Sequence, residues 1–401
     1  MRTRLRSPEW LFLFSGVAFD GVMWGWYLAA IVWWVEDLAF SPLELMLLGT
    51  VLLVVQQISE VPTGVVADRF SRKWSIVLGF LIMGAAVILS VVSTNFVVIL
   101  LAQGLAGFGW TFRSGADIAW VTAELPGADI SRLIVRRHRL HLVVGGISIP
   151  FVMVVGSWSL RGVMAMIGAF VVAGGFVLAA FMPDSKRELE ADEPELTVVE
   201  IFRHGVRTVR TSRSLTLLAL LALLTGAAAE TIDRLGFKRF LDEGDFGDDS
   251  LLFTGLVFLT LVVSGLIVIG VVERVIDRGW SYQSVAFAML VLATIGAVTI
   301  AIAPVIVVAV GLFLQDGNRE ALAPVTESWT NEIAEESSRA TVHSLMSLTI
   351  GLGESVGGLG LAVVAEVWSI EASLLGAAAA LALAAALCRL TTTEERVIPA
   401  G

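Results

Sequence analysis

Apolar runs recur along the whole chain and alternate with short polar segments. Each run is about twenty residues long, which is the length an α-helix needs to cross the hydrocarbon core of a bilayer. The pattern predicts an all-α membrane protein with twelve spanning helices, called spans 1 to 12 in chain order. They are expected over residues 9–35, 43–67, 73–93, 96–122, 138–157, 161–182, 214–240, 251–272, 280–302, 304–330, 340–366 and 371–390.

The longest polar stretch, residues 183–213, separates two sets of six spans. After an acidic patch it holds a segment whose apolar residues share one helical face, which predicts an amphipathic helix on the membrane surface. We therefore expect an N-terminal six-helix bundle over residues 1–182, a cytoplasmic linker over 183–213 and a C-terminal six-helix bundle over 214–401.

Composition agrees with this class, because 56% of the 401 residues are hydrophobic and only 16% are charged. Soluble proteins carry about a quarter charged residues. The basic N-terminus runs into an apolar segment without a small-residue cleavage site, so we expect a retained first helix and not a signal peptide.

Orientation follows from the lysines and arginines, which collect on the cytoplasmic side of a membrane protein. With the N-terminus inside, 21 of the 27 basic residues fall in cytoplasmic segments. Of the other six, Arg161, Arg234, Lys238 and Arg239 are assigned to the outside, and only Arg113 and Arg319 to the interior of spans. Both termini and the linker are therefore expected in the cytoplasm.

A short internal repeat supports two related halves. Gly64–Ser75 matches Gly270–Ser281 at six of twelve positions without a gap, including Arg72 with Arg278 and Trp74 with Trp280. Both copies follow the second span of a six-span half, and parallel six-helix repeats are a known transporter arrangement.

The first copy resembles the loop motif of the major facilitator superfamily, Gly-x-x-x-Asp-(Arg/Lys)-x-Gly-(Arg/Lys)-(Arg/Lys). Ser71 stands where the second glycine belongs. The resemblance implies the twelve-helix fold of that superfamily, secondary transport, and a latch in which Asp68 joins span 2 to span 11. By the same resemblance Arg113 and Asp117 join that network, and Arg339 is a neighbour of Asp68. The matching residues are Gly64, Asp68, Arg69, Arg72 and Lys73.

Three further stretches resemble bacterial drug:proton antiporters of the macrolide and multidrug exporter type. They are "EVPTGVVADR", "RATVHSLMSL" and "GLGESVGG". The last is similar to the antiporter motif Gly-Pro-x-x-Gly-Gly, with Glu354 in place of proline, and it falls in span 11 where the family has it in span 5. The arginine of the family's span 4 motif is replaced by Leu100.

Ionisable residues near the bilayer centre cost roughly 2.5–3.5 kcal/mol each on insertion scales, so they need a reason. In this chain they fall on spans 1, 4, 7 and 10, the spans that line the central cavity of the superfamily. These residues are Asp20, Arg113, Asp117, Glu230, Asp233, Asp316, Arg319 and Glu320.

We expect Asp20 to carry protons, because it has no charged helical neighbour and a lone buried carboxylate is readily neutralised. Asp316, Glu320 and Glu354 are further proton carriers, and Arg319 is expected to hold either Asp316 or Glu320 ionised. The other charged residues of these spans have alternatives. Arg113 and Asp117, four residues apart, can form a purely structural helical pair. Glu230 and Asp233 either line the cavity or face the water outside.

Aromatic residues surround these charges on spans 1 and 4. Next to a carboxylate they favour a hydrophobic or amphipathic ligand, either neutral or cationic. Anchoring at the membrane interface is the alternative for those near span ends. The expected cavity aromatics are Trp24, Tyr27, Phe108, Trp110 and Phe112.

The sequence contains no motif typical of an enzyme or of a metal site. There is no Walker loop, the single Cys388 cannot form an intrachain disulfide or thiolate cluster, and the glycine runs suit helix packing better than nucleotide binding. We expect no cofactor, no metal and no nucleic-acid partner.

The prediction is a monomeric transporter of the bacterial inner membrane that exports a hydrophobic or amphipathic small molecule in exchange for protons. Proton-coupled uptake of a small metabolite is one alternative. A membrane sensor or scaffold that transports nothing is the other.

Overall fold

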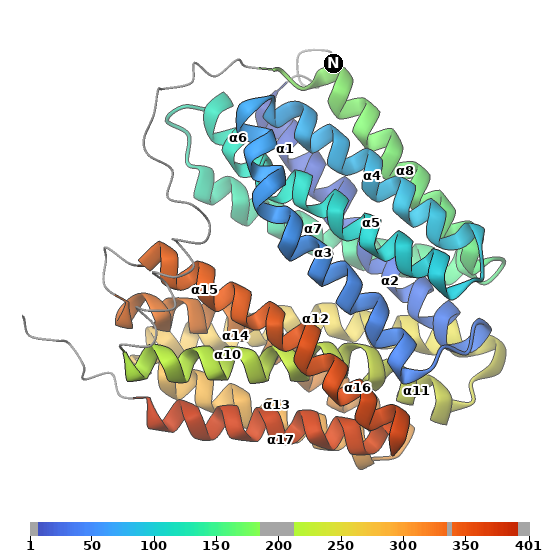
Figure 1. Ribbon diagram of the computed structural model, residues 1–401, viewed down its shortest axis with the longest axis vertical. Helices are drawn as coiled ribbons and strands as arrows, with labels where there is room; N and C mark the ends of the chain where they lie inside the picture. Colours follow the sequence, from blue (N-terminus) through green and yellow to red (C-terminus); the bar gives the residue numbers. More distant parts are fainter. Residues whose placement is uncertain (1–6, 185–211, 335–338, 392–401) are drawn as a thin grey trace, which may run out of the picture. The chain divides into compact units, whose positions relative to one another are not determined.

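The structure is a computed structural model that describes residues 7–184, 212–334 and 339–391. Throughout this part of the chain every regular element is a helix, as predicted (Figure 1). The expected amphipathic linker helix lies outside the described residues.

Contacts divide the chain into two compact units. Unit 1 comprises residues 1–40, 47–189 and 245–262, and unit 2 comprises residues 41–46, 190–244 and 263–401. The bundle boundaries at residues 182 and 214 stay a prediction.

The first six predicted spans correspond to the following helices. Span 1 is a continuous helix that changes geometry along its length, and span 4 is broken at Gly115 and Ala116. The bounds are α1 Pro8–Gly16, η2 Val17–Gly21, α2 Val22–Val32, η3 Trp33–Asp37, α3 Pro42–Arg69, α4 Arg72–Val92, α5 Phe96–Ser114, α6 Asp117–Glu124, α7 Ile130–Gly156 and α8 Leu160–Phe181.

The last six predicted spans also correspond to helices, and spans 7 and 11 change from α- to π-helical geometry in their middle. The bounds are α10 Arg213–Thr231, η4 Ile232–Gly236, α11 Phe237–Gly244, η5 Gly247–Asp249, α12 Ser250–Asp277, α13 Tyr282–Ile302, α14 Val305–Ile333, α15 Arg339–Leu352, η6 Gly353–Gly357, α16 Gly358–Val367 and α17 Ile370–Leu390.

Eleven helical stretches of the described chain are long and apolar enough to cross a membrane. The remaining predicted span, span 10, corresponds to α14, which is 29 residues long. It falls outside that set because each of its 18-residue windows holds more than two acidic or basic residues. Its middle carries Asp316, Arg319 and Glu320.

Polar caps close many of these helices. The free N–H groups of a helix's first turn need acceptors, because they have no partner within the helix. The side chains at seven N-caps accept such hydrogen bonds, namely Ser71, Asn95, Asp129, Ser159, Ser212, Ser281 and Ser369.

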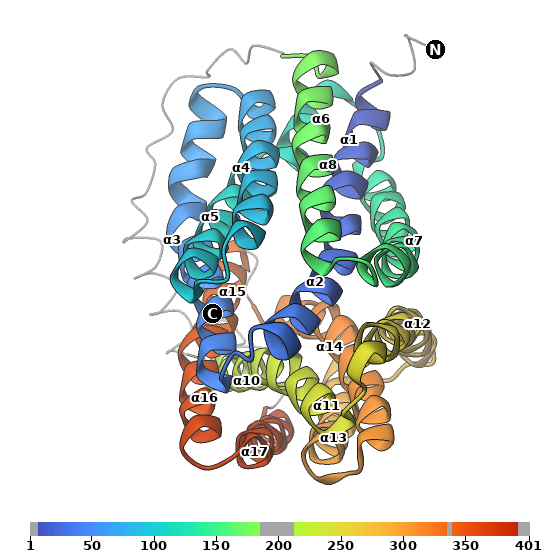
Figure 2. The ribbon, with the colours of Figure 1, turned by 90° about the vertical axis from the view of Figure 1, so that its right-hand side faces the viewer.

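Glycines allow the helices of unit 1 to approach closely. In this unit α4 packs against both α5 and α8 (Figure 2). A Cβ atom on Gly79 would lie 2.9 Å from the Gly109 carbonyl oxygen of α5, and one on Gly84 would lie 2.7 Å from the Gly168 carbonyl oxygen of α8. Small residues at such crossings let backbones meet, which drives helix association in lipid.

In unit 2, α10 packs against α15, η6 and α17, and α13 packs against α14 and α17 (Figure 1). At the crossing of α10 with η6, a Cβ on Gly353 would overlap the Leu223 carbonyl oxygen, and one on Gly226 would overlap that of Ile350. The glycine-rich stretch of span 11 is therefore a helix-packing surface.

We predict that Gly353→Val destabilises the protein by about 1–3 kcal/mol, because the added methyl groups displace the backbone of α10. The measurement is thermal unfolding of the detergent-purified protein. Gly360→Val is the matched control, since no atom lies within 4 Å of the Cβ position of Gly360. Equal unfolding midpoints for the two variants would contradict the packing described for this crossing.

Candidate functional site

Three spans change from α- to π-helical geometry at the position of an ionisable residue. Such π-bulges insert an extra residue into a turn and are frequent at functional sites. The segments are η2 with Asp20, η3 with Glu36 and Asp37, η4 with Asp233 and Arg234, and η6 with Glu354.

A closed ring of four charges occupies the interior of unit 1. The guanidinium of Arg113 lies 2.6 Å from Asp20 and 3.2 Å from Asp117. Arg137 lies 2.5 Å from Asp117 and 3.3 Å from Asp20. Each carboxylate therefore contacts both arginines, and the formal charges of the ring sum to zero.

The surroundings of the ring are apolar and aromatic. The side chains of Arg113 and Asp117 are each only 3% exposed. The rings of Phe19 and Trp110 lie 4.4 Å and 5.3 Å from the Arg113 guanidinium. Trp110, expected to contact substrate, thus lies against the ring of charges.

Asp20 is not the lone carboxylate that the sequence predicted, because it pairs with both Arg113 and Arg137. Nothing in the sequence indicated the second pair, since Arg137 lies in a segment that we expected to be cytoplasmic. Arg137 lies on α7, and its side chain passes Gly16 of the first helix to reach Asp20. Gly16, one turn before Asp20, provides the space for the Arg137 side chain, because a Cβ atom at this position would lie only 2.6 Å from Cγ of Arg137. The predicted pairing of Arg113 with Asp117 is present.

The other expected cavity aromatics of unit 1 contact one another or neighbouring side chains. Trp24 donates a hydrogen bond from its indole nitrogen to Nε2 of His141 at 3.0 Å. The ring centroid of Tyr27 lies 5.9 Å from that of Phe258, and those of Phe108 and Phe112 are 5.0 Å apart. Their role in binding substrate stays a prediction.

The loop between α3 and α4 carries the expected latch residues. Asp68 pairs with Arg72 at 2.9 Å, and Arg72 also donates a hydrogen bond to the Ala119 carbonyl oxygen at 2.9 Å. Lys73 lies over the ring of Trp74. Arg69 is exposed.

Two further residues of the expected latch lie apart from other groups within their own units. No atom of unit 1 lies within 4 Å of the Cβ position of Gly64. Arg339 is exposed at the start of α15, and its proximity to Asp68 stays a prediction.

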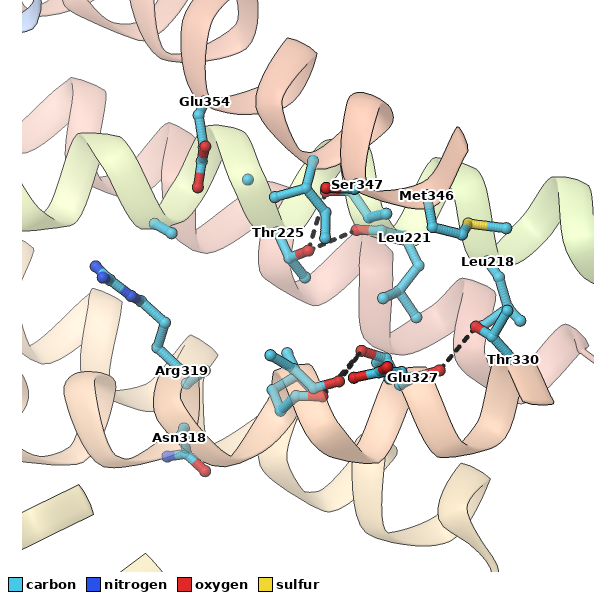
Figure 3. Close-up of a pocket in the computed structure, with 18 of the residues that line it drawn as sticks. Leu218, Leu221, Thr225, Asn318, Arg319, Glu327, Thr330, Met346, Ser347 and Glu354 are labelled. Atoms are coloured by element: carbon cyan, nitrogen blue, oxygen red, sulfur yellow. Dashed lines mark hydrogen bonds between the residues drawn. The ribbon is translucent and has the colours of Figure 1, made fainter. Parts of the chain in front are cut away.

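A cavity of about 540 Å³ opens within unit 2. It is lined mainly by α10, α14 and α15 with Glu354 of η6, and Figure 3 shows Glu354 and Arg319 pointing from facing helices into the same space. The apolar lining includes Leu218, Leu221, Met346 and Ile350. The polar lining is Thr225, Gln315, Asn318, Arg319, Thr326, Glu327, Thr330, His343, Ser347 and Glu354.

The glycine crossing of α10 and η6 positions Glu354. A Cβ on Gly226 would lie 3.2 Å from the backbone nitrogen of Glu354, so the two backbones are in contact at this point. Within the described chain Glu354 has neither a hydrogen bond nor an ion pair. The charged groups that act on it are Glu230 of α10 and Arg319 of α14.

The basic residues near this cavity are already paired. Arg319 forms an ion pair with Asp233 of η4, a different helix, where the sequence suggested Asp316 or Glu320. Arg234 pairs with Glu230 at 2.5 Å. The side chain of Glu320 lies outside the described part of the structure. Glu230 and Asp233 are not among the described residues that line the cavity.

One face of α14 carries most of the polar lining, at helical spacings of three and four residues. Gln315 is 6% exposed, and its Oε1 has no hydrogen-bond partner among the described residues. Asn318 is 3% exposed and donates to the Leu314 carbonyl oxygen at 2.6 Å.

Sequence reasoning missed several of these residues. Gln315 and Glu327 lie four residues before and eight after Arg319, so helical spacing from the predicted arginine would have identified them. His343, whose ring nitrogen lies 2.7 Å from Oδ1 of Asn331, had no such signal.

A family model described as the Major Facilitator Superfamily matches residues 13–312 of the chain. No curated protein sequence matches it. Among solved structures, a mutant of the nucleoside transporter NupG is 13% identical, with 96% of this chain and 100% of that chain covered and a TM-score of 0.83.

A bacterial homolog of the human lysosomal transporter Spinster, in an inward-facing and unoccupied conformation, is also similar. It is 13% identical, 96% of each chain is covered, and the TM-score is 0.72. At these identities the similarity shows a shared fold.

We predict that Asp117→Asn destabilises the protein by about 3–5 kcal/mol, because it leaves a buried arginine charge uncompensated. Combining it with Arg137→Gln restores a neutral ring, so the double variant is expected to unfold at a higher temperature than the single one. The measurement is thermal unfolding in detergent.

Asp68→Asn is the control for this comparison, because it removes an exposed ion pair. Asp68 is 60% exposed, and such pairs contribute at most about 1 kcal/mol. A double variant less stable than Asp117→Asn would show that neutrality of the ring is not what stabilises it.

Proposed function

The chain belongs to the major facilitator superfamily, and we propose that this transporter exports a hydrophobic or amphipathic compound in exchange for protons. In the proposal, two six-helix halves alternate in exposing a central site to the two sides of the membrane. The protein is a monomer of the bacterial inner membrane with both termini in the cytoplasm.

The observation that carries the proposal is Glu354, a carboxylate that faces a ligand-sized cavity and has no ionic partner among the described residues. Ligand sites in proteins typically enclose about 300–1,000 Å³, and this cavity falls within that range. A carboxylate in such a place can bind either a proton or a polar substrate group, which is the requirement for exchange.

Arg319 tunes this site from the facing helix. Because Asp233 compensates its charge, Arg319 does not hold Glu354 in a permanent ion pair. We propose that Glu354 carries the exchanged proton and that Arg319 and Asp233 set how readily it is released. Asp316 and Glu320 remain candidates for a second proton.

The ring in unit 1 supports a different role for Asp20 from that of the sequence hypothesis. Protonating Asp20 would leave two arginines with one carboxylate between them, which is costly in an apolar interior. We therefore assign Asp20, Arg113, Asp117 and Arg137 to holding the helices of that bundle together. The loop residues Asp68 and Arg72 are proposed to act in the conformational latch.

We predict that Glu354→Gln abolishes proton-coupled export, since the amide cannot carry a proton. The measurement uses everted membrane vesicles with a pH-sensitive dye, in which wild-type protein is expected to dissipate a proton gradient on addition of ethidium or rhodamine 6G. Glu332→Gln, on the same helix as Arg319 but outside the cavity lining, is the matched control and is expected to behave as wild type.

A Glu354→Gln variant that still releases protons would refute the assignment of the proton carrier. Accumulation driven by an inward proton gradient would instead indicate uptake by symport. Flux at background level with every compound tested would favour a sensor or scaffold.

We also predict that Asp20→Asn lowers the unfolding temperature while the folded fraction keeps proton-coupled flux. The physical reason is that Arg113 and Arg137 donate to different oxygens of Asp20. The amide keeps only one of these acceptors and no longer compensates the charge of the two arginines. Purified protein in liposomes separates the two effects, because flux is normalised to folded transporter. Loss of coupling with unchanged stability would return the proton-carrier role to Asp20.

A further inference from the structure

The loop between α3 and α4 differs from the motif of the major facilitator superfamily at one position, where Ser71 replaces the second glycine. The backbone at Ser71 is extended, with φ at −170° and ψ at 125°. Every residue type can adopt this conformation, so the fold does not require a glycine there. The replacement therefore leaves the backbone unstrained and adds a hydroxyl group to the loop.

The hydroxyl group of Ser71 makes two hydrogen bonds in different directions. As the N-cap of α4 it accepts one from the backbone N–H of Trp74 at 3.2 Å. It donates the other to Oδ1 of Asp184 at 2.7 Å. A hydroxyl group has one donor and two acceptor sites, so both bonds can exist together. The first bond closes the helix, and the second joins the loop to a residue just beyond the end of α8.

Two further hydrogen bonds connect the same two segments through α6. Arg72 donates to the carbonyl oxygen of Ala119 at 2.9 Å. The indole nitrogen of Trp120 donates to the carbonyl oxygen of Pro183 at 3.4 Å, and Trp120 itself is only 3% exposed. Together with the bond from the loop to the end of α8, these bonds close a hydrogen-bond triangle of three segments, which are residues 71–72, 119–120 and 183–184.

Each segment of the hydrogen-bond triangle is held by the other two. The position of a segment therefore depends on both of its bonds, and loss of one bond is expected to loosen all three segments, because interactions within one network are coupled. Arg72 carries this effect to the latch, since it also pairs with Asp68 at 2.9 Å. Ser71 precedes Arg72 in the chain, so fixing Ser71 fixes the backbone from which Arg72 reaches Asp68.

We propose that Ser71 is a positioning residue of the latch, which holds the loop against the end of α8 and thereby keeps Arg72 in place beside Asp68. The inference rests on the latch role proposed for Asp68 and Arg72. The chain continues from Asp184 toward α10 of unit 2, so a displacement of the chain at this residue would act directly on the latch. A glycine at position 71 has no side chain and could form neither hydrogen bond.

Hydrogen–deuterium exchange of the full-length protein in detergent tests the hydrogen-bond triangle and needs no substrate. The informative variant is Ser71→Asp, because aspartate is also a good N-cap but its carboxylate cannot donate to Asp184. We expect the backbone amides of residues 117–125 and 178–184 to exchange about three- to tenfold faster than in the wild type, since one bond of the triangle is lost. A residue that only capped α4 would leave exchange in both regions unchanged.

A second substitution restores the lost bond in the opposite direction. In the double variant Ser71→Asp with Asp184→Asn, the new amide group donates to the new carboxylate. Exchange in both regions is therefore expected to return to within about twofold of the wild type. Asp184→Asn alone keeps an acceptor for the Ser71 hydroxyl group, so it is expected to change exchange less than Ser71→Asp does.

Two more variants separate the anchor from the cap. Asp184→Ala removes the same bond without altering the cap of α4, and it is expected to raise exchange as much as Ser71→Asp does. Ser159→Ala is the matched control. Ser159 caps the other end of α8 by accepting from the N–H of Gly162 at 3.0 Å. Its replacement is therefore expected to leave exchange over residues 117–125 and 178–184 unchanged.

Transport kinetics show whether the hydrogen-bond triangle acts on the latch. In proteoliposomes, Ser71→Asp is expected to lower the maximal rate of ethidium-driven proton flux about three- to tenfold and to leave KM unchanged. The reason is that the loop is not part of the cavity lining and acts only on the change of conformation. Asp184→Asn in the same protein is expected to restore the rate.

Unchanged exchange in both Ser71→Asp and Asp184→Ala would overturn the inference, as would faster exchange that Asp184→Asn does not reverse. Faster exchange with an unaltered transport rate would refute the positioning role in the latch. The outcome is separable from proton antiport. Absence of proton-coupled flux in the wild-type protein would refute the antiport alone, and the exchange comparison, which involves no transport, would then decide the inference by itself.

Discussion

Arg113 and Arg319 are charged side chains inside apolar helices, and each is held by a carboxylate that comes from another helix. In a medium of low polarity an isolated charge costs several kcal/mol, so such an arginine stabilises the fold only when its partner is in place. The positions of the first, fourth and fifth spans in unit 1 therefore depend on one another through the ring. In unit 2 the seventh and tenth spans are joined by the partly exposed pair of Asp233 with Arg319.

The two units use this compensation differently. In unit 1 the charges close into a ring in which each carboxylate contacts both arginines, and the ring leaves no carboxylate for other chemistry. In unit 2 the arginines near the cavity are paired, whereas Glu354 has no ion pair within the part of the chain that the structure describes. The surplus carboxylate lies where a ligand-sized space is available, which is why we place the exchange chemistry there.

Backbone geometry brings this carboxylate to the cavity. Gly226 and Gly353 allow α10 and η6 to touch, and the π-helical turn of η6 sets the direction in which Glu354 leaves its helix. Close packing and a π-bulge thus act together. In sequence this stretch resembles an antiporter motif. In the structure its glycines form a helix contact, and its glutamate has no hydrogen bond or ion pair to any described residue.

The amino-acid sequence alone determined the helices and their charges. Apolar runs long enough to cross a bilayer predict spans by length and hydropathy, both local properties, so all twelve appear as helices. Helical spacing likewise predicted the pair of Arg113 with Asp117. Only the tertiary structure decided which charges meet across helices, because Arg137 with Asp20 and Arg319 with Asp233 are far apart in the chain. Packing of separate helices also decided that Gln315 and Glu354 line one cavity. The spacing of residues along one helix does not determine how far that helix lies from another helix.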